Sequence, residues 1–248
     1  MKSILYTFFL SILLGIIFSC ENETIEVTGE PVGRSYFPLS VGSEWIYQVD
    51  SIIYDESQAT VDTTSGFVRE LITEQLNDGS YRIERYFSRQ LSSDWEITDV
   101  WSARYEDTRA VRNEENLSFI KLVFPPALDV DWDGNSLFDE NVFVTVAGEL
   151  LQPYKFWDYR ITEIDGTYNL ENNVLSDVVT VSQVNNRDVE NPNLVERRVA
   201  IEQYADNVGL VFKQMEILDS RGNYPAGTPF EDRIERGFRM EQRLIQFR

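Results

Sequence analysis

The sequence predicts a mainly β fold, arranged as a single curved antiparallel sheet or open half-barrel with at most one or two short helices. Three observations carry this prediction. Apolar and polar residues alternate with a period of two along many short segments. Turn-forming pairs such as Asp78-Gly79 separate these segments, and helical patterns are scarce. With 248 residues, 42% of them hydrophobic, the chain is also large enough to bury a core.

The first expected strand follows Pro38 and Gly42, which interrupt regular structure. In this strand Trp45 and Tyr47 fall on one face, and their rings bury a large area in a sheet that has no disulfide. Further strands are expected, in chain order, over residues 67–76, 81–87, 95–101, 117–124, 142–146, 159–164, 174–184, 210–218 and 237–247. Roughly this many strands in one chain fit a single sheet.

The segment 193–204 is compatible with two structures. Asn193 can cap a helix, and Glu196 stands three residues later, as in a capping box. Val195, Val199 and Ile201 also fit a strand pattern. The sequence leaves both open.

Three parts are expected along the chain: a signal peptide over 1–19, a flexible tether over 20–34, and a single β-rich domain over 35–248. Lys2 precedes an apolar run over 4–18 and then Ser19, which is the pattern of a secretory signal. The run is shorter than the roughly 20 residues that a membrane span needs. The polar residues that follow have few apolar neighbours, which favours a flexible tether.

Cys20 marks the end of the signal peptide. The stretch Ile17-Phe18-Ser19-Cys20 resembles the bacterial lipobox, although Phe18 is bulkier than is usual there. The resemblance implies that Cys20 receives diacylglycerol, that the preceding peptide is removed, and that the new amine is acylated. Several acyl chains, at about 0.8 kcal/mol per buried CH₂, give a stable membrane anchor. An ordinary secreted protein with a chance cysteine is the alternative.

The charge and the absent residue types exclude several functions. The net charge of −20 argues against a nucleic-acid partner, whose phosphates would be repelled. Removal of 1–20 takes away only Lys2, which gives −20 − 1 = −21. The chain has no histidine and only one cysteine, so it lacks a histidine-based catalytic relay, an intrachain disulfide and a cysteine-clustered zinc site. No catalytic residues are assigned, and no cofactor is expected apart from the calcium considered next.

One acidic segment, 129–140, has the spacing of a calcium-binding loop. Carboxylates stand at its positions one, three, five and twelve: Asp129, Asp131, Asp133 and Glu140. Gly134 occupies position six. Pro125 and Pro126, however, prevent the incoming helix of such a loop, and Asp133-Gly134 suits a sharp turn. We expect a turn here, with weakly held calcium as the alternative.

Three motifs, found near residues 36–47, 132–135 and 204–213, resemble a family of uncharacterised Bacteroidota outer-membrane lipoproteins. They are Tyr36-Phe-Pro-Leu39 with Gly42, Trp45 and Tyr47, then Trp132-Asp-Gly134-Asn135, then Tyr204-Ala followed by Val208-Gly209-Leu-Val-Phe-Lys213. The last motif also resembles parts of half-barrel proteins of the LolA/LolB type. The resemblance implies a curved sheet around an apolar groove and structural roles for Trp45, Tyr47, Trp132, Gly134, Tyr204 and Gly209. It carries over no catalytic residue.

These observations predict a lipid-anchored binding or scaffold lipoprotein that has protein partners in the outer membrane or holds an apolar ligand. The acidic residues Glu21 and Glu23 after the cysteine resemble a surface-export signal, which favours the cell surface; the periplasm-facing leaflet remains open. Two alternatives stay open. One is a glycan hydrolase that uses two carboxylates, and the other is a receiver of lipid or lipoproteins, which rests on fold analogy.

Overall fold

The computed structural model describes residues 32–91, 94–171, 173–186, 195–220, 224–225 and 227–248. Cys20, the expected signal peptide and all but the last residues of the expected tether lie outside this part. The described chain forms one compact unit within Pro31–Arg248. Among its residues, no helix is long and apolar enough to cross a membrane.

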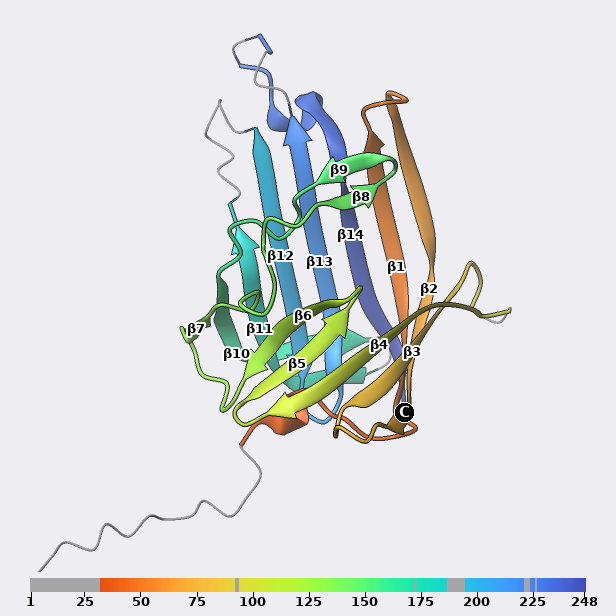
Figure 1. Cartoon of the computed structure of the whole chain (residues 1–248), viewed down its shortest axis with the longest axis vertical. Coiled ribbons are helices and arrows are strands. Elements are labelled where there is room, and N and C mark those ends of the chain that lie inside the picture. The colour runs from red at the N-terminus through yellow and green to blue at the C-terminus, as the bar shows by residue number, and fades with distance from the viewer. Residues whose placement is uncertain (1–31, 92–93, 172, 187–194, 221–223, 226) are drawn as a thin grey trace, which may run out of the picture. The chain divides into compact units, whose positions relative to one another are not determined.

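Fourteen strands and two short 3-10 turns make up the described fold (Figure 1). The turns are η1 (Arg34–Tyr36) and η2 (Phe230–Arg233). The strands are β1 (Glu44–Asp55), β2 (Thr60–Gln75), β3 (Tyr81–Ser88), β4 (Glu96–Glu106), β5 (Arg109–Glu114), β6 (Leu117–Val123), β7 (Asp131–Trp132), β8 (Val144–Val146), β9 (Glu149–Leu151), β10 (Tyr159–Leu170), β11 (Asn173–Asn185), β12 (Glu196–Ala205), β13 (Gly209–Ser220) and β14 (Ile234–Phe247).

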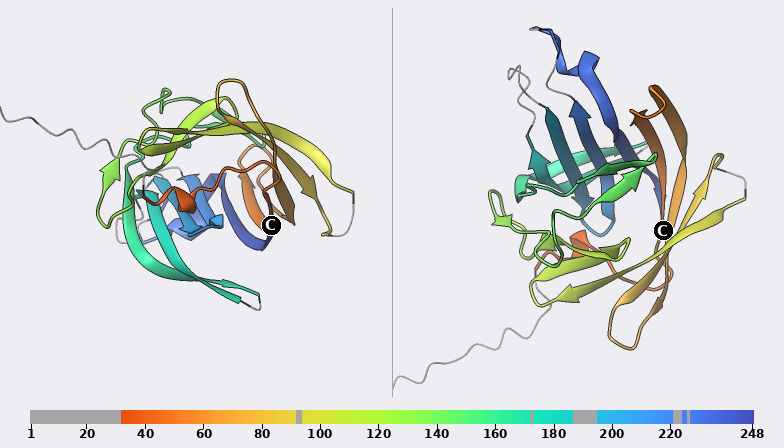
Figure 2. Two further views of the ribbon diagram at one scale, coloured as in Figure 1. Left: turned by 90° about the horizontal axis from the view of Figure 1, so that it is seen from below. Right: turned by 45° about the horizontal axis from the view of Figure 1, so that its top comes forward.

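Twelve of the strands form one antiparallel sheet in the order β6-β5-β4-β3-β2-β1-β14-β13-β12-β11-β10-β7. Strands that pair in this sheet follow each other in sequence, except that β1 pairs with β14 and β10 pairs with β7. Seen from below, the sheet curls round until its two ends approach each other (Figure 2). The predicted fold class, a mainly β chain with a single curved antiparallel sheet, is therefore confirmed.

The sheet is nearly closed, but its seam between β6 and β7 is not sealed by a ladder. The backbone N–H of Ile120 donates to the carbonyl of Gly134 (2.8 Å). The indole N–H of Trp132 donates to the carbonyl of Ile120 (2.8 Å). Aromatic rings reinforce this junction, since Phe119 of β6 packs edge-on against Tyr154 with centroids 5.1 Å apart.

β8 and β9 form a separate hairpin that lies in front of β13 and β14 (Figure 1). A two-stranded hairpin is marginal by itself. Leu151 of β9 is almost fully buried in the main core, and Val146 of β8 packs against that core. These contacts attach the hairpin to the concave side of the sheet.

The helical alternative for 193–204 is wrong over the described residues, because Glu196–Ala205 form β12. This strand pairs with β11 on one side and with β13 on the other. Most residues of β12 are buried, so its sequence lacks the simple alternation that marks a half-buried strand. Tertiary pairing here outweighs the local capping signal. Asn193 lies outside the described residues.

Candidate functional site

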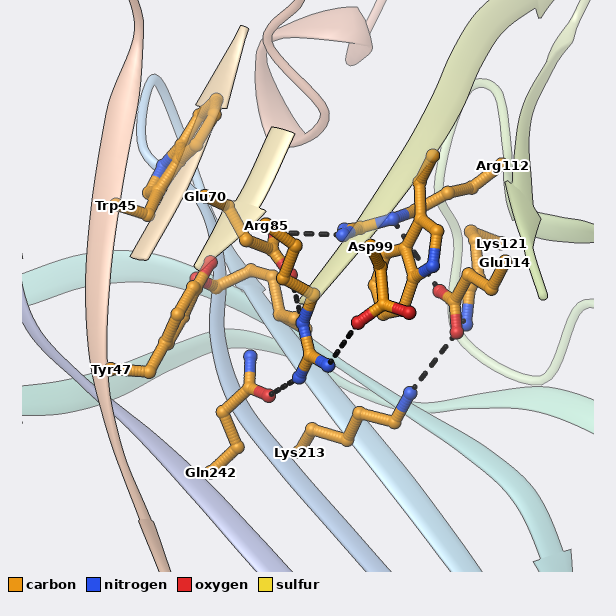
Figure 3. A network of polar contacts seen from close by, with 12 residues as sticks. Trp45, Tyr47, Glu70, Arg85, Asp99, Arg112, Glu114, Lys121, Lys213 and Gln242 are labelled. Carbon is orange, nitrogen blue, oxygen red and sulfur yellow. Dashed lines mark hydrogen bonds and ion pairs between the residues drawn. The ribbon is translucent and has the colours of Figure 1, made fainter. Parts of the chain in front are cut away.

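A chain of charged side chains runs through the concave interior of the sheet (Figure 3). Its members come from β2 to β6 on one wall and from β12 and β13 on the other. Four cations and four carboxylates take part: Arg85, Arg112, Lys121, Lys213, Glu70, Asp99, Glu114 and Glu202. Burial of so many charges costs solvation energy, which their mutual attraction must offset.

The first half of the network is centred on Glu70 of β2, which is only 2% exposed. Its carboxylate lies 2.7 Å from the guanidinium of Arg112 and 3.4 Å from that of Arg85. Arg85 also lies 3.8 Å from Asp99 on β4. Both guanidinium groups stack on the indole ring of Trp101, at 4.5 and 4.8 Å from the ring centroid. The pairs therefore join β2, β3, β4 and β5 on their concave face.

The second half of the network crosses from one wall to the other. Lys121 of β6 lies 3.0 Å from Glu114 and 2.9 Å from Glu202 of β12. Lys213 of β13 lies 3.4 Å and 3.5 Å from the same two carboxylates. The hydroxyl of Tyr204 donates to Glu202 (2.5 Å). Two lysines and two glutamates thus bridge the strands nearest the seam to the centre of the opposite wall.

Electrostatics fix the charge states in this second half. Burial alone would raise the pKa of Glu114 and Glu202, but the ammonium groups of Lys121 and Lys213 outweigh it and lower both values. Burial alone would lower the pKa of Lys213, and Glu114 and Glu202 raise it instead. Burial raises the pKa of Tyr204 well above its ordinary range, so its phenol stays a hydrogen-bond donor.

These shifts predict how stability depends on pH. Because the folded-state pKa of Glu114 and Glu202 is depressed, their contribution is complete above the ordinary glutamate value of 4.5 and is lost as pH falls below it. We expect the free energy of unfolding in urea to be steady near neutral pH and to fall steeply between about pH 4.5 and 3. Glu202→Gln should have a shallower slope over this interval. Parallel slopes for the two proteins would contradict the assignment.

A small cavity of about 30 Å³ adjoins the first half of the network. Trp45, Tyr47 and Gly209 line it together with Glu70 and Arg112. A volume of this size holds roughly one water molecule. Two-carboxylate glycoside hydrolysis requires space for a sugar between the acids. This cavity has no such space, and its one carboxylate, Glu70, is already paired with two guanidinium groups.

The motif residues of the first and third motifs meet beside this cavity, although more than 150 residues separate them in sequence. The indole N–H of Trp45 donates to the carbonyl of Val208 (2.6 Å). The hydroxyl of Tyr47 donates to the carbonyl of Leu210 (3.1 Å). Gly209 lies between these two acceptors with a positive φ of +92°, which favours glycine. The two aromatic side chains thus clamp the start of β13.

The second motif builds the seam. Trp132 reaches β6, as described above, and a side chain at Gly134 would meet the ring of the buried Tyr159 at 2.4 Å. Asn135 is buried and accepts a hydrogen bond from the hydroxyl of Tyr159 (3.0 Å). These contacts place Trp132 and Gly134 at the seam. Tyr204 belongs instead to the ion network, through Glu202.

The acidic segment 129–140, expected to form a turn with calcium as the alternative, places its carboxylates in different local contacts. Asp131 belongs to β7 and forms a two-pronged ion pair with Arg160. Asp133 accepts the backbone N–H of Asn135 (3.0 Å), as in an Asx turn. Within the described ranges no three acidic side chains come together as a metal site. The calcium alternative for Asp129, Asp131, Asp133 and Glu140 stays a prediction.

Sequence reasoning missed the ion network. Lys121 interrupts the apolar run 117–124, and a lone charge in a strand that must be buried is a signal for a buried partner. The partners could not be read from the sequence, because Glu202 lies 81 residues away and meets Lys121 only through the curvature of the sheet.

Comparisons with known proteins add little. No protein-family model matches this chain, and no curated protein matches it. One solved structure to which it is similar is that of a putative lipoprotein from Parabacteroides distasonis, with 12% identity, a TM-score of 0.32, and coverage of 86% of this chain and 98% of that one. A TM-score this low supports no inference about the function of this chain.

Proposed function

We propose that this protein is a lipid-anchored binding or scaffold module of the bacterial outer membrane, displayed at the cell surface. The observation that carries the proposal is the lipobox-like stretch ending at Cys20, the one cysteine of the chain. A polar segment links this residue to the folded body. An acylated cysteine would hold that body at the bilayer while leaving it free to meet partners.

Because side chains fill the interior of the β-rich domain, its outer surfaces are the parts available to bind other molecules. The concave face is occupied by buried aromatic side chains and by the paired charges centred on Glu70 and Glu202. The cavity beside them is of water size. A rigid, filled sheet suits a module that presents strands, loops and edges to other molecules.

The lipid anchor is tested by replacing its attachment point. Cys20→Ala should move the protein from the membrane pellet to the soluble fraction, and intact-mass analysis should lose the mass of the acyl chains. Ser19→Ala, which keeps the cysteine, should remain in the membrane. Retention of the Cys20→Ala protein in membranes at normal yield, or the absence of lipid on the wild-type chain, would contradict the proposal.

A further inference from the structure

The upper half of β2 is a free strand edge. β2 pairs with β1 over its first twelve residues, Thr60 to Leu71, without a bulge. β3 joins it only from Phe67 onward. Among the strands that the structure describes, none lies along the other side of Thr60–Ser65 (Figure 1). In an antiparallel ladder, alternate residues turn N–H and C=O away from the paired strand. This edge therefore presents unpaired backbone donors and acceptors to solvent.

Thr60–Ser65 lacks most of the features that keep natural edges unpaired. Lysine, proline and bulges commonly protect such edges. None of the three occurs here, and Asp62 is the sole charge. All six residues are exposed, and four of them are β-branched, which favours the extended conformation. The edge is preorganised to receive another strand.

Two acidic hollows open beside the same edge. One, of about 250 Å³, is lined by Thr63 and Ser65 together with three carboxylates and one guanidinium group. The other, of about 380 Å³, is lined among the residues that the structure describes by Thr60 and Val61 together with Asp55, Glu56 and Glu235. The carboxylates of the first hollow are already paired with Arg197, Arg239 and Arg243. The exposed Asp62 and the net charge of −20 therefore favour basic over acidic side chains at this edge.

We propose that an extended segment of a partner polypeptide, carrying lysine or arginine, adds to the Thr60–Ser65 edge as an extra strand. This deepens the proposed binding function and rests on it. Backbone hydrogen bonds supply the affinity of strand addition, and hollows beside the edge select the side chains. A second copy of this chain fits less well, because two bodies of net charge −20 repel each other.

The test uses the full chain in detergent and two fluorescent octapeptides, one alternating valine with lysine and one alternating valine with glutamate. The valine–lysine peptide should bind by fluorescence anisotropy, and amide hydrogen exchange should slow at Thr60–Ser65. The valine–glutamate peptide should not bind. Failure of the valine–lysine peptide to bind, or slowed exchange elsewhere only, would overturn the proposal.

Proline variants separate edge pairing from general attraction of cations. Of the neighbouring residues Thr63 and Thr64, one turns its N–H toward β1 and the other toward the free edge. One of the variants Thr63→Pro and Thr64→Pro removes an N–H that faces the free edge, and this variant should keep the wild-type melting temperature. It should bind the valine–lysine peptide about tenfold more weakly, because it loses edge hydrogen bonds. Glu163→Gln, which removes an acid from another strand, should bind as the wild type does.

Equal binding by both proline variants would also overturn the proposal. The peptide assay does not depend on lipidation. Its failure is therefore distinguishable from failure of the anchor, which the Cys20→Ala fractionation reports.

Discussion

Replacing Gly237 with alanine is expected to destabilise the protein more than any other single substitution proposed for it. A Cβ at this position would lie 2.0 Å from the carbonyl oxygen of Ile217 and 3.0 Å from the Cα of Leu218. Both are backbone atoms of β13, which cannot swing away as a side chain can. The φ of +120° is also unfavourable for alanine. We expect a loss above about 4 kcal/mol, measured by urea unfolding.

Gly79→Ala is the matched control for this variant. Gly79 also has a positive φ, +83°, but a Cβ there meets nothing within 4 Å. Its cost should be limited to backbone strain, roughly 1–2 kcal/mol. Similar losses in the two variants would show that the approach of β14 to β13 is looser than described.

The second large effect is expected at the centre of the ion network. Glu202→Ala leaves Lys121 and Lys213 with Glu114 as their remaining shared carboxylate, in a largely buried site. Removing one partner of a buried ion pair typically costs about 3–5 kcal/mol, because a charge stays buried without compensation. Thermal and urea unfolding should both detect this loss.

Two comparisons test the cause of that loss. The exposed pair Asp131–Arg160 is the matched control, and Asp131→Asn should cost less than about 1 kcal/mol. The double variant Glu202→Met with Lys121→Met should recover part of the stability lost by Glu202→Ala, since apolar groups of similar size often replace a buried ion pair without loss. A double variant that is weaker than Glu202→Ala would point to packing as the cause.

Local patterns predicted much of the sheet. The alternation at Trp45 and Tyr47 correctly gave β1, and the Asp78-Gly79 turn correctly separated β2 from β3. The short strand β5 was missed, because six residues with three charged side chains do not stand out as a strand. β12 was ambiguous for a related reason: its Arg198 and Glu202 are buried through partners that sequence spacing does not show.

The candidate site was less predictable than the fold. Buried charges such as Glu70 and Arg112 look like ordinary surface residues until the curvature of the sheet brings their strands together. The acidic spacing at 129–140 predicted a turn with calcium as the alternative, and it gave no sign of Arg160 on the neighbouring strand, which pairs with Asp131. Ion pairs between strands distant in sequence depend on topology, and no local pattern encodes them.

The pairing of β1 with β14 has a consequence for biogenesis. Glu44 and Arg248 exchange backbone hydrogen bonds of 2.9 and 3.0 Å. β1 therefore gains its second neighbour only when residues about 204 positions later in the chain are available. Contacts of such long sequence separation form late and slow folding. A nascent chain that does not yet include β14 therefore lacks the strand that joins the β1–β6 half of the sheet to the β10–β13 half.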